Sequence, residues 1–206
     1  NIDDARHTGG VLGPHLIPAI DDLDRWLNKL WAAVEETGEA ENTDIFLVSD
    51  HGQRDVRRNI SLNVLFAENG FIRLAEDGSV DSWDAYCLSN GMSALVFLRD
   101  KDDLCLQKKV YSFLEKLLDE EVYGFSSIYT EEESRREEHF GGPFSFVLET
   151  DGYTSFGDYL KRPLVRDLSN EDYRFGAATH GYLPNTGPQP ILLAKGPSIR
   201  KNVILS

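Results

Sequence analysis

The stretch that most constrains the fold of this chain is Ile45–Val48 and the polar turn that follows it. Its four apolar residues lack polar alternation, which predicts a strand buried on both faces, as in a parallel α/β sheet. Open α/β sheets place their functional residues just beyond the carboxyl ends of strands. Asp50 and His51 stand there before Gly52, and they predict half of a divalent metal site. The alternative is an Asp that caps a helix beside a hydrogen-bonded His, and this stretch alone favours neither.

Length and charge limit the class of protein. The chain has 206 residues, of which 41% are apolar, enough for one α/β domain with a sizeable core or one domain with a small insertion. Asp and Glu number 35 against 21 Lys and Arg, so the formal net charge is -14. Such a surface repels polyanions and argues against a nucleic-acid polymer as partner. A small phosphorylated substrate stays compatible, because metal ions can reverse the local field.

The two cysteines give little support for thiolate chemistry. Cys87 and Cys105 lie outside any CxxC pattern, so a zinc-thiolate site is not expected. A disulfide between them is possible, although two free thiols are favoured.

No apolar run approaches the ~20 residues of a membrane span. The sequence leaves the oligomeric state and the compartment open, with the cytoplasm favoured.

Periodicity predicts an α/β fold with a largely parallel sheet flanked by helices. Helices are expected over residues 14–38, 62–69, 103–122 and 130–138, the last with capping-box spacing at its start. Strands, mostly in one sheet, are expected at Ile45–Val48, Ala94–Leu98, Phe144–Leu148 and Ile191–Ala194. Residues 1–13 are expected to form a loop. Residues 53–92 are expected to hold a small insertion containing a hairpin that turns at Asp77 and Gly78.

Three predicted loops carry residues that can bind a metal. The first holds Asp3 and His7, the second Asp50 and His51, and the third His180, just before the last strand. Imidazole nitrogens and carboxylate oxygens suit zinc, and mixed sets of the two also suit manganese. Each pair alone is weak evidence, because such pairs occur often by chance.

The order of these motifs resembles the alkaline phosphatase superfamily. The closest match is its type I phosphodiesterase/nucleotide pyrophosphatase branch, and the resemblance runs from Asp3 to Pro197. It rests on three motifs in order: Asp-x-x-x-His, Ser-Asp-His-Gly after a strand, and Thr-His-Gly-Tyr before a strand. The resemblance implies an α/β hydrolase of phosphoesters with two divalent ions, zinc by preference and manganese as the alternative. It implies that Asp3, His7 and His180 hold one ion. Asp50 and His51 would hold the other.

Two departures from the family pattern qualify this expectation. The family's Thr or Ser nucleophile and a further metal-binding Asp would both lie before Asn1. We therefore expect residues 1–206 to be the later half of a larger domain, with no catalytic nucleophile and no turnover of its own. Arg6 replaces a usual Gly and either contacts an anionic substrate or points to solvent. The alternatives are a metal-dependent phosphosugar mutase of the same superfamily and a non-catalytic module.

Overall fold

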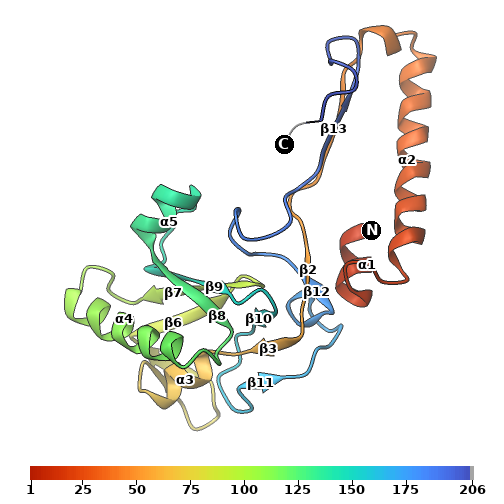
Figure 1. The fold of residues 1–206 in the computed structure, drawn as a ribbon. Helices are drawn as coiled ribbons and strands as arrows, with labels where there is room; N and C mark the ends of the chain where they lie inside the picture. Colours follow the sequence, from red (N-terminus) through yellow and green to blue (C-terminus); the bar gives the residue numbers. More distant parts are fainter. Residues whose placement is uncertain (205–206) are drawn as a thin grey trace.

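The computed structural model describes residues 1–204, which form a compact body and an extended arm (Figure 1). The arm consists of helix α2 (Leu16–Glu36) and two paired strands, β1 (Ile45–Val48) and β13 (Leu192–Lys195). The strands pair antiparallel, and the ammonium group of Lys195 lies 4.1 Å from the centre of the Trp31 ring on α2. The short helix α1 (Ile2–Gly9) lies at the junction of arm and body.

The body is built on a four-stranded antiparallel sheet in the order β6-β7-β9-β8. Its strands are β6 (Ala85–Ser89), β7 (Ser93–Leu98), β8 (Phe125–Thr130) and β9 (Phe146–Thr150). Helix α4 (Leu104–Asp119) covers it with Val110, Leu114 and Leu117, which recur on one helical face and are buried. Each such side chain stabilises the fold by about 1.5–3 kcal/mol through removal of apolar surface from water.

Shorter elements complete the body. Three small sheets contain β2 (Arg54–Asp55) with β12 (Ala178–Thr179), β3 (Arg58–Ile60) with β10 (Thr154–Phe156) and β11 (Val165–Arg166), and β4 (Ile72–Leu74) with β5 (Val80–Trp83). The remaining helices are α3 (Asn63–Glu68), α5 (Glu131–Glu138) and the 3-10 turns η1 (Ala40–Asn42) and η2 (Tyr173–Phe175). Strands β2 and β12 lie where the arm meets the body, and α5 lies at the end of β8 (Figure 1).

The α/β class is confirmed, but the expected single, largely parallel sheet is wrong. The four predicted strands are present, yet two belong to the arm and two to the antiparallel sheet. Within residues 1–204, only β3 and β10 pair parallel. Strand β1 is not buried on both faces, because Phe46 and Val48 are 59% and 62% exposed. A continuous apolar run therefore identified the strand correctly but not its neighbours or its direction.

The N-terminal segment also differs from expectation. Residues 1–13 were expected to form a loop, whereas Ile2–Gly9 is helical. The side chain of Asn1 caps the helix by accepting a hydrogen bond from the Asp4 amide at 2.8 Å. Asp3 and Asp4 add negative charge to the first turn, where the helix dipole favours it. The segment has no clear apolar stripe at helical spacing, so its sequence predicts a loop. Its polar residues nevertheless favour the start of a helix.

The other predicted helices and the hairpin are confirmed within a few residues. Helix α5 begins with the expected capping box, in which the Thr130 hydroxyl accepts from the Glu133 amide and the Glu133 carboxylate accepts from the Thr130 amide. The β4–β5 hairpin turns at Asp77 and Gly78, where Gly78 has φ +87°. Strands β6 and β8 were not expected, and in β8 Ser126 and Ser127 interrupt the apolar pattern.

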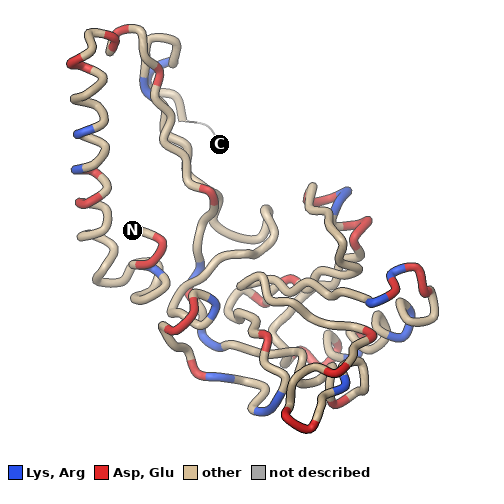
Figure 2. Tube along the Cα trace, turned by 180° about the vertical axis from the view of Figure 1, so that it is seen from behind, with Lys and Arg blue, Asp and Glu red and all other residues tan. Residues whose placement is uncertain are grey.

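The arm leaves much apolar surface exposed. The large side chains that are more than half exposed there are Ile17, Trp26, Leu30, Phe46, Val48, Ile191, Leu192 and Leu193. Charged residues lie mainly on the body and along α2, whereas most of β1 and β13 is uncharged (Figure 2). In the described part of the chain, none of the helices combines the length and apolar character needed to cross a bilayer.

The two thiols are predicted to differ in reactivity. Cys87 lies 2% exposed in β6, and burial raises the pKa of its thiol far above the usual value, whereas Cys105 is exposed on α4. Native protein treated with a disulfide reagent at pH 8 should therefore release one equivalent of chromophore quickly, and the second only after denaturation. A Cys105→Ser variant should lose the fast phase, and a fast phase that persists would contradict this assignment.

Candidate metal centre

Helix α1 presents the first two candidate ligands. Asp3 and His7 are four residues apart, so they share one helical face, with His7 Nε2 3.3 Å from Asp3 Oδ1. His7 is buried, and its Nδ1 lies 2.6 Å from the carbonyl oxygen of Ala178. Because a carbonyl only accepts, Nδ1 carries the proton, and the lone pair of Nε2 points toward Asp3.

The turn after β1 presents Asp50 and His51. The Nδ1 atom of His51 lies 3.1 Å from the carbonyl oxygen of Gly52, which leaves Nε2 with a free lone pair by the same argument. His51 Nε2 is 3.6 Å from Asp50 Oδ2, and the Asp50 side chain is 87% exposed. The Gly52 carbonyl therefore orients the ring of His51, and the exposed side chain of Asp50 has room to turn toward a cation.

His180 follows β12 and is held by its main chain. The Met92 amide donates to the His180 carbonyl at 2.8 Å, and the Ser93 hydroxyl donates to the Gly181 carbonyl at 2.5 Å. The two segments approach so closely that each needs a glycine. A Cβ on Gly181, which has φ +92°, would lie 1.7 Å from the Asn90 carbonyl oxygen, and a Cβ on Gly91, which has φ +77°, would lie 2.3 Å from the His180 carbonyl oxygen. The tight packing of the 89–93 turn fixes where the His180 ring can lie.

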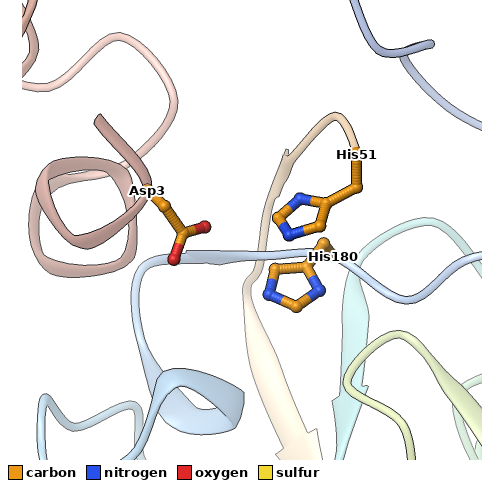
Figure 3. Close-up of side chains that lie close together, drawn as sticks. All are labelled: Asp3, His51 and His180. Atoms are coloured by element: carbon orange, nitrogen blue, oxygen red, sulfur yellow. The ribbon is translucent and has the colours of Figure 1, made fainter. Parts of the chain in front are cut away.

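The three segments converge (Figure 3). One donor atom each of Asp3, His51 and His180 lies within 4.8 Å of the others. The rings of His51 and His180 stack with centroids 3.8 Å apart, and the His7 ring centroid is 5.3 Å from that of His180. Burial, aided by the charge of His51, lowers the pKa of His180 to about 4. His180 is therefore neutral at pH 7, the form that binds a metal.

The donor set fits a divalent cation. It combines imidazole nitrogens with a carboxylate, the ligands that zinc takes, and the carboxylates supply the charge. The tightest group contains His51 rather than His7, whereas the sequence resemblance places His7 with Asp3 and His180. His7 lies directly beside this group, and Asp50 lies at its exposed edge.

Two residues of the centre escaped the sequence analysis. Gln53 donates to Asp3 Oδ1 at 2.7 Å, and the Tyr173 ring lies parallel to that of His180 with centroids 5.3 Å apart. Gln53 directly follows the Asp-His-Gly turn, and this position could have indicated that it lies near the candidate ligands. Tyr173 lies in a stretch without a clear period, so no signal marked it.

Comparison with known proteins gives the family. The family model for type I phosphodiesterase/nucleotide pyrophosphatase matches residues 1–182. The chain belongs to this family. No curated protein sequence is matched significantly. The family acts on phosphoesters and uses divalent metals, which agrees with the donor set described above.

Solved structures with this fold include ectonucleotide pyrophosphatase/phosphodiesterase 5 from mouse and human. The murine protein, as an inactive threonine-to-alanine variant in complex with AMP, superposes with a TM-score of 0.66 at 22% identity. The human protein gives a TM-score of 0.65 at 20% identity. In both comparisons the match covers 97% of this chain and 46% of the other. This family member therefore spans about half the length of the solved structures it resembles.

A buried carboxylate supports the loop that follows His180. Glu149 on β9 is 2% exposed and accepts hydrogen bonds from the Leu183 amide at 3.0 Å and from the Thr186 hydroxyl. Burial raises the pKa of Glu149 to about 7, although both hydrogen bonds oppose this shift. The carboxylate thus joins the main sheet to the loop while changing charge close to neutral pH.

The raised pKa of Glu149 predicts a pH-dependent stability. The unfolded chain loses this proton near the ordinary glutamate value and the native state near 7, so the free energy of unfolding falls as pH rises between these values. In a Glu149→Gln variant, the decrease in the free energy of unfolding from pH 5 to pH 8 should be smaller than in the parent by roughly 1–3 kcal/mol, as measured by urea denaturation. Glu115→Gln, at an exposed glutamate on α4, is the control. An identical pH profile for Glu149→Gln and the parent would contradict the prediction.

Proposed function

We propose that this chain supplies the metal-binding half of a phosphodiesterase or nucleotide pyrophosphatase that uses two divalent ions, zinc by preference and manganese as the alternative. Asp3, His7 and His180 hold one ion, and Asp50 and His51 contribute to the other. The observation that carries the proposal is that members of both ligand sets converge from three separate segments: donor atoms of Asp3 and His180 from the first set and of His51 from the second lie within 4.8 Å of one another. A small phosphorylated substrate, of the nucleotide type seen with the murine relative, is the proposed ligand.

The residues of this chain bind and orient rather than transfer protons. His7 and His51 keep their Nε2 lone pairs free because Nδ1 faces a backbone carbonyl in each. His180 stays neutral because partial burial, beside the rings of His51 and Tyr173, lowers its pKa. Divalent ions bound here supply Lewis acidity, which activates an oxygen nucleophile and offsets the charge of the phosphoryl oxygens.

We further propose that the nucleophile is a Thr or Ser hydroxyl in the part of the fold that residues 1–206 do not contain. The solved structures are about twice as long as this chain, and the murine variant that lacks one threonine is described as inactive. Residues 1–206 are then the later half of the catalytic domain. A covalent step through such a hydroxyl would divide hydrolysis into two easier steps.

The test compares two lengths of polypeptide on an aryl phosphodiester, bis(4-nitrophenyl) phosphate, with zinc or manganese present. A protein with the complete fold of the solved relatives should release nitrophenol and stop when a chelator removes the metal. The 206-residue chain alone should show negligible turnover. Chelator-resistant hydrolysis by the short chain would overturn the proposal. Conversion of a phosphosugar without hydrolysis would instead favour the mutase alternative.

A further inference from the structure

Gln53 joins two of the segments that carry the proposed metal ligands. Its side chain is 4% exposed, between the Asp-His turn and helix α1. Its Nε2 lies 2.7 Å from Asp3 Oδ1, 3.4 Å from the Asp3 carbonyl oxygen and 3.4 Å from His7 Nε2. Asp3 and Gln53 are 50 residues apart in sequence, so this contact is a tertiary link between α1 and the end of β1.

The chemistry of the partners fixes the orientation of the amide. A carboxylate oxygen only accepts, so the group that faces Asp3 must be the NH2 and not the oxygen of the amide. In the neutral form that binds a metal, His7 Nε2 also only accepts, because the ring proton lies on Nδ1 and faces Ala178. One amide nitrogen therefore supplies donors toward both atoms that the proposed function assigns to metal binding.

Asp3 has little else to orient it. Its side chain is 44% exposed, and within residues 1–204 its carboxylate contacts only Gln53 and His7. A carboxylate offers several lone pairs, so Asp3 can keep its hydrogen bond to Gln53 while another lone pair binds a cation. The 3.4 Å contact with His7 is long, and His7 can give it up when a cation takes its lone pair.

We propose that Gln53 is a positioning residue for metal binding, which holds the Asp3 carboxylate in the orientation that a divalent cation needs beside His7. This inference rests on the proposed function, because it assumes that Asp3 is a ligand. Loss of such an outer hydrogen-bond partner typically lowers metal affinity 10–100-fold. Gln53 therefore acts through Asp3, and its effect should depend on Asp3.

The test measures zinc affinity by competition with a chromophoric chelator, in the wild type and in Gln53→Met, which keeps the side-chain length but cannot donate. We expect about 10–100-fold weaker zinc binding by a metal-free variant that is still folded in circular dichroism. The matched control is Gln107→Met on α4. In an Asp3→Ala background, Gln53→Met should change the affinity by less than about twofold, because the residue it positions is already absent.

The outcomes separate this inference from the proposed function. A wild type that binds no zinc contradicts the metal centre and with it the role of Gln53. If the wild type binds zinc, equal or tighter binding by Gln53→Met overturns the inference alone, since Gln53 would then be neutral or compete with the cation. Equal losses with and without Asp3 would show that Gln53 does not act through the carboxylate, and they also overturn it.

Discussion

Replacing His180 by alanine should lower zinc affinity more than any other single change in this chain. His180 is half-buried in the cluster, its ring stacks on those of His51 and Tyr173, and burial keeps it neutral at pH 7. Its loss removes a metal-binding nitrogen, so the effect should exceed the roughly 10–100-fold that loss of an outer partner costs. In a protein with the complete fold, most of the phosphodiesterase rate should disappear as well. Titration calorimetry with zinc measures the first effect directly.

A histidine outside the cluster gives the control. His139 ends α5 in the left-handed conformation, φ 54°, and lies apart from the centre. His139→Ala should bind zinc as the parent does. If both histidine variants bound zinc equally well, His180 would not be a ligand. Circular dichroism should show that His180→Ala keeps its secondary structure, because the Met92 amide binds the carbonyl of residue 180 and the Ser93 hydroxyl binds the carbonyl of Gly181.

Replacing Asn63 by alanine should destabilise the body strongly. Asn63 is fully buried, and its amide donates to the Cys87 carbonyl at 2.7 Å while its oxygen accepts from the Cys87 amide at 2.8 Å. Cys87 lies on β6, an edge strand of the main sheet, so Asn63 pairs backbone groups that no neighbouring strand reaches. Two buried groups left without partners cost about 1–3 kcal/mol each, so the free energy of unfolding should fall by roughly 2–6 kcal/mol.

Urea denaturation of the variant and of Asn28→Ala tests this prediction. Asn28 is exposed on α2 and bonds only within its own helix, to Asp24, so its loss should change stability by less than about 0.5 kcal/mol. A fall below about 1 kcal/mol for Asn63→Ala would mean that water replaces the lost hydrogen bonds and that the edge of β6 is not sealed by this residue.

The local signals in the sequence were sufficient for most helices, and they also picked out the residues proposed as ligands. Period and capping placed α2, α4 and α5, because an amphipathic stripe or a capping box is a local property. The carboxylate and imidazole residues were recognisable from motif order alone. Their approach in space follows from the fold, in which α1, the end of β1 and the end of β12 meet.

Pairing of strands could not be predicted in the same way. The run Ile45–Val48 shows that a strand exists, but its antiparallel pairing with β13 depends on residues far along the chain. Strand β8 was missed because Ser126 and Ser127 break its apolar pattern. Gln53 and Glu149 acquire their roles only through tertiary contacts, with Asp3 in one case and Leu183 and Thr186 in the other.

The most direct test of the metal centre is anomalous diffraction at the zinc edge from crystals of this chain grown with zinc. We expect an anomalous peak about 2.0–2.2 Å from donor atoms of Asp3 and His180, with His7 or His51 completing its ligands. The same crystals measured below the edge should show no such peak. Zinc peaks only at other surface sites, or none near Asp3 and His180, would contradict the assignment of this cluster as the metal centre.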